Sequence, residues 1–302
     1  MDAAGDDQRM VESEPALPHP RTGVSFASPV PAGSGWPGDL ATAGTPVAGT
    51  SADVERLAGR ATTLADLDRD STVCRACPRL VAWREDVAVV KRRAYRDQPY
   101  WGRPAAGFGD PTAGLLIAGL APAAHGANRT GRLFTGDRSG DWIFAALHRA
   151  GAASQGMSAD AADGLRLAGV RMVAAVRCAP PDNKPLPVER DTCGPWMRRE
   201  VELTAPTVRV VMALGAFGWQ AAVAVARSLG WTVPRPAPRF GHGAHAVLLR
   251  PDGVAVDLVG CYHVSQQNTQ TGRLTEQMLD AVLRDCLERV GSRRDAGDGH
   301  GH

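Results

Sequence analysis

Short apolar runs of strand length alternate with segments of helical periodicity in the second half of the chain, and this alternation constrains the fold most strongly. The strand runs are residues 115–121, 170–178 and 208–215, followed by two strands within residues 245–265 around a Pro-Asp-Gly turn. The helical segments are residues 142–151, 216–230 and 274–290. Strands that alternate with helices predict an α/β sandwich built on a mostly parallel sheet.

The two ends of the chain differ in composition from this region. Residues 1–50 are rich in Pro, Gly, Ala, Ser and Thr and show no sustained period of 2 or 3.6. We therefore expect a disordered N-terminal tail over residues 1–50 and a single folded domain over residues 51–290. The last residues, 291–302, predict a flexible C-terminal tail.

Charge and hydropathy narrow the class of protein. The N-terminus is acidic and lacks the apolar core of a secretory signal, and no run approaches the roughly 18 apolar residues of a membrane span. The net charge of +2 is too small to require a polyanionic partner. It does not exclude one, because a local basic patch is enough to bind nucleic acid. We expect a soluble, cytoplasmic, monomeric protein, in which the six cysteines form no disulfides.

Long polar loops follow three of the predicted strands. They are residues 119–137 and the segments after Cys178 and after Cys261. Ligands of parallel sheets bind at the carboxyl ends of the strands, so three such loops predict a functional site at one sheet edge.

Four cysteines have a spacing that suits metal ligation. Cys74 and Cys77 form a Cys-x-x-Cys pair, whereas Cys178 and Cys193 are separated by 14 residues. Four thiolates can hold either zinc or a [4Fe–4S] cluster, and the loose second pair favours the cluster over a zinc ribbon. The alternative is that Cys178 and Cys193 are ordinary buried thiols and that the tight pair is a lone redox motif. The other two cysteines, Cys261 and Cys286, are expected in the core.

Several of these motifs together resemble a known family. They are GLAPAAHGANRTGRLFTGD (119–137), VRCAPPDNKP (176–185), the four cysteines, and CYHVSQQNTQTGR (261–273) before the last helix. They resemble the uracil-DNA glycosylase superfamily, and within it family 5, the type b enzymes of actinobacteria and thermophiles. The resemblance covers residues 74–290. It implies a three-layer α/β/α sandwich with a central, mainly parallel four-stranded sheet, and a [4Fe–4S] cluster on Cys74, Cys77, Cys178 and Cys193.

The resemblance also implies how a flipped base would be held. Phe134 would stack on the base, Asn183 would read the uracil edge, and His263 would donate a hydrogen bond to the uracil oxygen that gains negative charge. From the residues alone, Phe134 can instead cover the core, Asn183 can be a turn residue between prolines, and His263 can be structural. Ala121 and His125 are assigned to the same base pocket.

The expected catalytic carboxylate lies at the far end of the first loop. Ala121 occupies the position where better-known relatives place an Asp or Asn that handles water, and family 5 shares this lack. Asp137 is then the nearest motif carboxylate to orient water or oppose a cationic sugar; alternatively, it only caps the following helix. Asn128 either contacts the sugar or phosphate or only shapes the loop.

Positive and polar side chains predict contacts to DNA, mostly to its phosphates. The assigned residues are Arg129, Arg132, Lys184, Gln266, Gln267, Asn268 and Arg273. Val264 replaces the proline that most relatives carry after the histidine, and the wedge region is polar, so forceful intercalation is not expected. The basic run 91–96 (KRRAYR) is either a phosphate-binding segment or a solvated face.

The predicted activity is that of a monofunctional DNA glycosylase. The resemblance implies excision of uracil, and of other deaminated bases such as hypoxanthine, during base excision repair. No lysine in these loops is placed to form an imine, which predicts cleavage of the glycosidic bond without strand cleavage. The competing hypothesis is a non-catalytic nucleic-acid-binding protein stapled by a four-cysteine metal centre.

Overall fold

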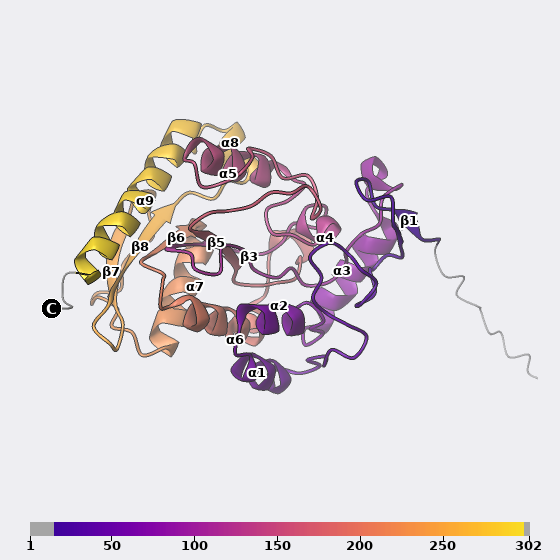
Figure 1. Cartoon of the computed structure of the whole chain (residues 1–302), viewed down its shortest axis with the longest axis horizontal. Coiled ribbons are helices and arrows are strands. Elements are labelled where there is room, and N and C mark those ends of the chain that lie inside the picture. The colour runs from indigo at the N-terminus through magenta and orange to yellow at the C-terminus, as the bar shows by residue number, and fades with distance from the viewer. Residues whose placement is uncertain (1–14, 299–302) are drawn as a thin grey trace, which may run out of the picture.

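The sheet at the centre of the molecule has four parallel strands with an antiparallel strand at each edge (Figure 1). The computed structural model describes residues 15–298, with side chains to residue 293. The strand order is β3 (Phe108–Gly109), β5 (Val170–Ala174), β4 (Leu115–Gly119), β6 (Val210–Leu214), β8 (Ala255–Cys261) and β7 (His245–Leu249). The mainly parallel sheet is therefore confirmed, but it has six strands where four were expected. The unexpected edge strand β3 is two residues long, too short to produce a period.

Helices cover both faces of the sheet, which makes three layers. Alternate residues of a strand point to opposite faces, and on β4 Leu115 and Ile117 pack in one core whereas Leu116 and Ala118 pack in the other. The first core is completed by α5 (Arg138–Arg149) and α9 (Glu276–Asp298), and the second by α6 (Pro187–Thr204) and α7 (Gly215–Ser228). The predicted α/β/α sandwich is confirmed.

Three helices precede the sheet in the chain. They are α1 (Ser51–Arg60), α2 (Leu64–Ser71) and α3 (Pro78–Val90), and α1 and α2 pack on α6. Both α1 and α2 begin at a capping box, in which a threonine side chain and the aspartate three residues later satisfy each other's backbone N–H groups. Two short helices, α4 (Ala127–Thr130) and α8 (Gln266–Gln270), lie in the loops after β4 and β8.

A buried ion cluster connects α2 and α6 to the sheet. On β5, Arg171 Nε donates to Glu200 Oε1 of α6 at 2.7 Å, and its Nη2 donates to Asp68 Oδ2 of α2 at 3.0 Å. Arg177 pairs with the same two carboxylates. Removing one partner from such a cluster leaves an uncompensated buried charge, which typically costs about 3–5 kcal/mol.

Residues 15–50 are folded onto the domain, so the disordered tail predicted over residues 1–50 is wrong for this part. They contain the paired strands β1 (Leu17–Pro18) and β2 (Ser25–Phe26). Three of their apolar side chains form a buried cluster with Trp101: Phe26, Val30 and Trp36. The backbone of this segment is mostly irregular, and its large apolar side chains are buried at isolated positions. For this reason the sequence shows no helix or strand period here. Residues 1–14 lie outside the described residues.

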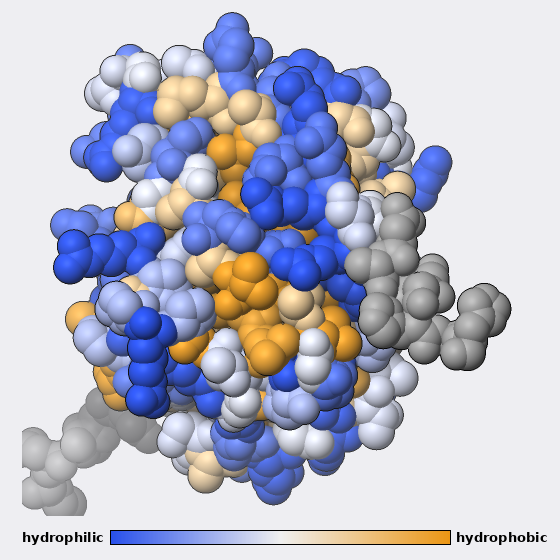
Figure 2. All heavy atoms as spheres, turned by 90° about the vertical axis from the view of Figure 1, so that its left-hand side faces the viewer, coloured by the Kyte–Doolittle hydropathy of each residue, from blue (hydrophilic) through white to orange (hydrophobic). Residues whose placement is uncertain are grey.

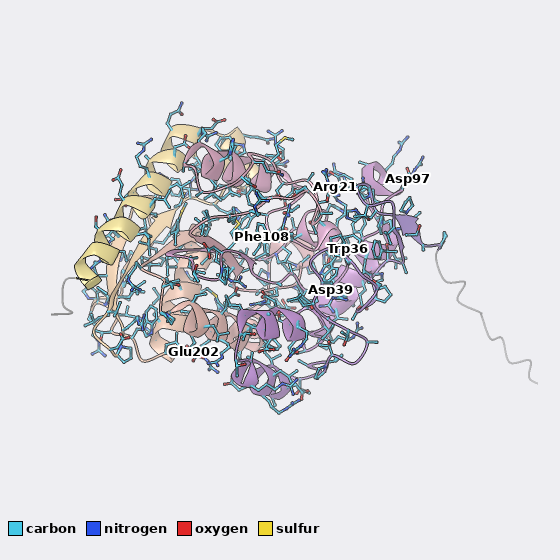
Figure 3. The ribbon with its side chains drawn as sticks, viewed as in Figure 1. Arg21, Trp36, Asp39, Asp97, Phe108 and Glu202 are labelled. Carbon is cyan, nitrogen blue, oxygen red and sulfur yellow. The ribbon has the colours of Figure 1, made fainter. Side chains whose placement is uncertain are left out.

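Trp36 connects this segment to the loop that follows β4 (Figure 3). Its indole Nε1 donates to the carbonyl oxygen of Thr130 in α4 at 3.3 Å, and its ring meets that of Trp101 at a centroid distance of 6.0 Å. Nearby, Arg103 Nη2 and Asp39 Oδ1 form an ion pair at 2.8 Å in which both side chains are buried.

Replacing Trp36 by alanine is expected to lower the free energy of unfolding by about 3–5 kcal/mol, because the variant loses a buried aromatic side chain and leaves a cavity. Thermal unfolding measures the effect. Val24→Ala, which truncates a half-exposed residue of the same segment, is the control and should shift the midpoint little. Equal midpoints for the Trp36 variant and wild type would show that the segment does not contribute to folding.

The C-terminal helix is longer than predicted. The pattern predicted a helix over residues 274–290 and a tail from residue 291, whereas α9 continues to Asp298. Arg293 anchors this extension, because its Nε and Nη2 each donate to a carboxylate oxygen of Asp257 on β8 at 2.9 Å. The predicted C-terminal tail is thus wrong for residues 291–298, and His300 and His302 lie outside the described residues.

The end of the molecule that carries β7 and α9 presents apolar side chains among hydrophilic ones (Figure 2). The edge strand β7 exposes Val247 and Leu249 there. Within residues 15–298, no helix is long and apolar enough to cross a membrane.

Candidate active site and four-cysteine cavity

The carboxyl ends of the parallel strands meet at one edge of the sheet, as the loop pattern predicted. Gly119 at the end of β4 is in register with Ala174 at the end of β5, and Leu214 of β6 is in register with Cys261 of β8. The segments after β4, β5 and β8 carry the three polar motifs. Residues far apart in the sequence therefore share one edge.

Phe134 sits over the ends of β4 and β5. Its half-buried ring packs in a cluster with Ala127, Leu133 and Ala174. A Cβ atom on Gly119 would lie 2.8 Å from Phe134 Cζ, which is closer than real carbon contacts allow. The glycine at the end of β4 is needed so that the ring can approach the backbone.

Gly119→Ala is therefore expected to displace the Phe134 ring without unfolding the sheet. Stacking of a base on an aromatic ring is worth about 1–3 kcal/mol, so we expect single-turnover uracil excision to slow by about 5- to 150-fold, as for Phe134→Ala. The control is Gly59→Ala, because a Cβ at Gly59 in α1 meets nothing within 4 Å. A wild-type rate for Gly119→Ala would contradict a role of the ring in holding the base.

Asp137 is the N-cap of α5. Its Oδ1 accepts from the backbone N–H of Gly140 at 3.0 Å, and its Oδ2 lies against Gly126, where any Cβ atom would overlap it. Burial raises the pKa of Asp137 above the 3.8 of a free aspartate, although the cap hydrogen bonds act in the opposite direction. The capping role is thus present in the structure, and it occupies one carboxylate oxygen.

His263 follows β8 and is largely enclosed. Burial lowers its pKa from 6.5, so the imidazole is neutral at pH 7 and carries one N–H donor. Its backbone carbonyl accepts from Asn268 Nδ2 at 2.8 Å, which closes the turn into α8. Asn268 therefore shapes this loop, whereas the neighbouring Gln266 and Gln267 are exposed. Arg273 is also exposed, with its guanidinium 4.7 Å from the centre of the Tyr262 ring.

Asn183 and Lys184 are exposed on the loop after β5. Asn183 ends a one-turn 3-10 helix with φ of 55°, and Asp182 before it has φ of 54°. Phe134 has φ of 52°, so three of the four non-glycine residues with positive φ within residues 15–298 lie in these two loops. Such strained backbone concentrates at functional sites, where surrounding structure holds it in place.

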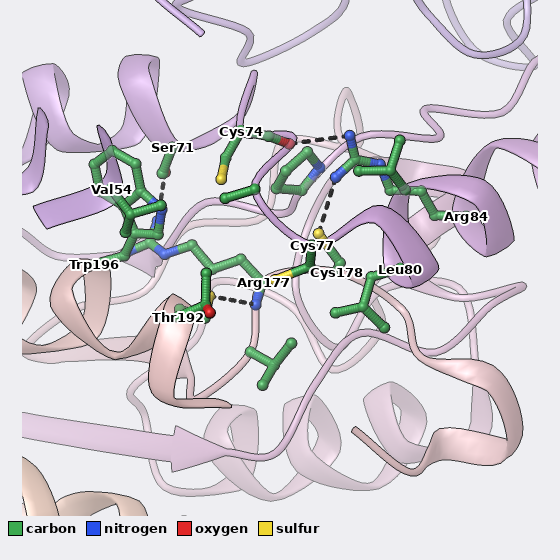
Figure 4. Close-up of a pocket in the computed structure, with 15 residues that line it drawn as sticks. Val54, Ser71, Cys74, Cys77, Leu80, Arg84, Arg177, Cys178, Thr192 and Trp196 are labelled. Carbon is green, nitrogen blue, oxygen red and sulfur yellow. Dashed lines mark hydrogen bonds between the residues drawn. The ribbon is translucent and has the colours of Figure 1, made fainter. Parts of the chain in front are cut away.

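The four motif cysteines line one cavity (Figure 4). Cys74 follows α2, Cys77 is the N-cap of α3, Cys178 follows β5, and Cys193 lies in α6. Burial raises the pKa of Cys77 to about 12, and the nearby thiols of Cys178 and Cys74 add to the shift. The cavity is thus lined by the segment around Cys74 and Cys77 and, far along the chain, by the segment after β5 and by α6.

The cavity walls present hydrogen-bond donors to these sulfurs. Arg84 of α3 is buried, and its Nη1 donates to Cys178 Sγ at 2.9 Å while its Nη2 donates to the carbonyl oxygen of Cys74 at 3.0 Å. The backbone N–H of Arg177 donates to Cys193 Sγ at 3.4 Å. A further buried donor, Arg84 Nε, lacks a partner among the described residues, and the side chain of Trp196 lies close enough to the Cys74 thiol to oppose the rise in its pKa that burial causes.

Four cysteines in one cavity are a ligand set that suits either a [4Fe–4S] cluster or a zinc ion. Four cysteine thiolates are the usual ligands of both. As the side chains stand within the described residues, no group of three or more Cys, His, Asp or Glu is arranged to hold a metal ion. Sulfide atoms of a cluster would accept a hydrogen bond from a buried donor without a partner such as Arg84 Nε.

Comparison with known proteins identifies the family. A model of the uracil DNA glycosylase superfamily matches residues 106–287. The proteins named type-5 uracil-DNA glycosylase from Mycobacterium bovis and Mycobacterium tuberculosis are each 57% identical over 273 residues, which cover 90% of this chain and 99% of the relative. The one from Thermus thermophilus is 51% identical over 220 residues, 73% of this chain and 95% of the relative.

This chain belongs to the uracil DNA glycosylase superfamily. The resemblance to family 5 that the motifs carry is confirmed by these type-5 relatives.

For this glycosylase-family chain, two predicted DNA contacts need correction. Arg129 is buried, and its guanidinium donates to the carbonyl oxygens of His125 and Gly136 at 2.9 and 3.0 Å. Arg132 is also buried, and its Nη2 pairs with Asp163 Oδ2 at 2.6 Å. Both guanidinium groups hold the loop after β4 in shape and are not free to bind phosphates.

Three other residues of the same loop have different surroundings. Asn128 is buried and its Nδ2 donates to the carbonyl oxygen of Arg84 at 3.1 Å, so it shapes the loop, as the alternative interpretation had it. His125 is half-buried, with its Nδ1 3.1 Å from the hydroxyl oxygen of Tyr100. Ala121 packs against the same apolar cluster as the four cysteines.

Sequence reasoning missed Arg84 and Trp196 as neighbours of the cysteines. Their spacing contained a signal: Trp196 follows Cys193 by three residues, and Arg84 follows Cys77 by seven residues. On a helix, residues at these separations share a face.

Proposed function

We propose that this chain is a monofunctional DNA glycosylase that flips uracil out of DNA and excises it, leaving an abasic site for base excision repair. The observation that carries the proposal is the meeting of three motif-bearing loops at the carboxyl edge of a parallel sheet, in a chain 57% identical to proteins named type-5 uracil-DNA glycosylase. The proposed substrates include other deaminated bases such as hypoxanthine. The enzyme acts as a monomer, in the cytoplasm, where its DNA substrate lies.

Base recognition is assigned to two loops. Phe134 offers the face of its ring to the flipped base, and Asn183 offers a donor and an acceptor to the uracil edge. The positive φ of both residues supports this assignment, because a strained backbone is retained where it positions a side chain for function. Ala121 places no polar atom at its position, which is compatible with a broad choice of base.

Bond cleavage needs charge stabilisation on both sides of the glycosidic bond, since the sugar becomes cationic and the base anionic. His263 is neutral at pH 7 because burial lowers its pKa, and its N–H would donate to the uracil oxygen that gains charge. Asp137, with Oδ1 held in the helix cap, would oppose the cationic sugar or orient water with its carboxylate.

The same proposal includes a [4Fe–4S] cluster on Cys74, Cys77, Cys178 and Cys193. When bound, the cluster would supply four strong metal–thiolate bonds and a redox-active centre. Cys178 lies five residues before Asn183. Fixing Cys178 would therefore hold the start of the loop that carries the base-reading amide.

The assay that tests the function treats uracil-containing DNA with the protein and then with alkali, which breaks the strand at abasic sites. Strand breaks at uracil only after alkali are the expected result. Intact strands would overturn the enzyme assignment and leave a non-catalytic nucleic-acid-binding protein. Lys184 is the only lysine in the three loops, and a borohydride-trapped covalent complex with DNA would contradict the monofunctional mechanism.

A further inference from the structure

The basic segment Lys91–Arg96 follows α3 and has no place in the site described above. Arg92, Arg93 and Arg96 are exposed, and Lys91 is half-buried. Within residues 15–298, the side chains of Lys91, Arg92 and Arg93 form no ion pair, whereas Arg96 Nε lies 3.6 Å from Asp97 Oδ2. Three adjacent positive charges thus have no ion-pair partner among the residues that the structure describes.

The segment is fastened to the loop that carries Phe134 and Asp137. Tyr95 lies in its 3-10 turn, and the guanidinium carbon of Arg129 is 4.0 Å from the centre of the Tyr95 ring. Arg129 Nη1 also donates to Gln98 Oε1 at 2.9 Å, just beyond the segment. Arg129 therefore links the basic segment to the loop that carries Phe134 and Asp137.

A second connection runs through Tyr100. Its hydroxyl oxygen is 3.1 Å from His125 Nδ1 and accepts from the backbone N–H of Arg92 at 3.4 Å. Burial lowers the pKa of His125, and the nearby positive charge of Arg92 lowers it further. The segment ends at the outer edge of the molecule, where Asp97 projects (Figure 3).

This arrangement differs from that of an ordinary solvated charge run. A solvated face needs no attachment to a functional loop, whereas here two aromatic residues and a glutamine tie the segment to it. Arginines without protein partners retain their full capacity to bind phosphate oxygens in a bidentate manner. A structured backbone also reduces the conformational entropy that binding would otherwise cost.

We infer that Lys91–Arg96 binds the phosphate backbone of DNA beside the excised base, mainly through Arg92 and Arg93. The inference rests on the proposed function, because DNA is the ligand. Phosphate contacts carry no sequence information, so this surface would hold the duplex in position whatever bases surround the damage. In this proposal the basic segment makes the phosphate contacts that were first assigned to Arg129 and Arg132, which are buried.

The test measures the salt dependence of binding. Affinity of the full-length protein for a uracil-free duplex is measured by fluorescence anisotropy from 50 to 200 mM salt. Each phosphate contact contributes about 0.9 to the slope of log affinity against log salt. For the Arg92→Ala/Arg93→Ala variant we expect this slope to become shallower by about 1.8, since two contacts are lost.

The matched control is Arg227→Ala/Arg284→Ala, which removes the same charge from exposed helix positions on α7 and α9. Its slope should stay at the wild-type value. Equal slopes for the two variants, or no loss in the first, would overturn the inference. Excision is assayed separately with the wild-type protein. DNA binding without excision would overturn the proposed function, and the slopes would still show whether Arg92 and Arg93 contact phosphates.

Discussion

Asp137→Asn is expected to slow single-turnover uracil excision by about 10²- to 10⁴-fold, the usual contribution of a positioned acid–base group. Thermal stability should be almost unchanged, because asparagine caps a helix about as well as aspartate and can still accept from the N–H of Gly140. The substitution therefore separates the two roles of this residue. Rates are measured with excess enzyme on a uracil-containing duplex.

Asp137→Ala is the companion variant. It removes the cap as well as the carboxylate, so it should lose about 1 kcal/mol of stability in addition to activity. If Asp137→Asn excised uracil at the wild-type rate, Asp137 would be a helix cap only, and the mechanism would depend on charge stabilisation by other groups.

The same carboxylate predicts the acid limb of the pH profile. Burial raises the pKa of Asp137 above 3.8, so the rate should begin to fall at a higher pH than a free aspartate would require, and this limb should be missing in Asp137→Asn. Between 3.8 and the raised pKa the folded state holds more protons than the unfolded state. The contribution of Asp137 to stability is therefore full below 3.8 and is lost as pH rises through that window.

Replacing Cys178 by serine is expected to abolish most binding of iron and acid-labile sulfide. If a cluster joins the three segments around the cavity, its loss removes folding free energy, and losses of about 4–5 kcal/mol or more are typical of a lost metal site. For a domain of this size that corresponds to a fall of about 10 °C or more in the unfolding midpoint. Iron and sulfide analysis and a thermal melt measure the two effects.

The control for this variant is Cys261→Ala, which removes a buried thiol outside the cavity, in the core beside α9. It should retain wild-type iron content and unfold only slightly earlier. One bound zinc and no sulfide in the wild-type protein would refute the cluster, and wild-type iron content in Cys178→Ser would remove Cys178 from the ligand set.

The sheet was predictable because its parallel strands are five or more residues long, buried at all positions but Ala255, and alternate with helical segments in the sequence. The motif loops were predictable for a related reason, since each directly follows such a strand. The strand β3 and the helices α4 and α8 contain two to five residues, which is too short for a period to appear. The burial of Trp36 was hidden because it depends on Trp101 and Thr130, far along the chain.

The sequence by itself determined the fold class, the family and the four cysteines, because strand–helix alternation and motif order are local properties of a chain. Only the tertiary structure decided which positive charges face solvent. Arg129 and Arg132 look like DNA contacts in sequence, yet each pairs with a residue 31 positions away, Gln98 and Asp163 respectively. Arg92 and Arg93 were left undecided, and the structure places both in exposed positions, where no acidic side chain among the described residues lies close enough to pair with them.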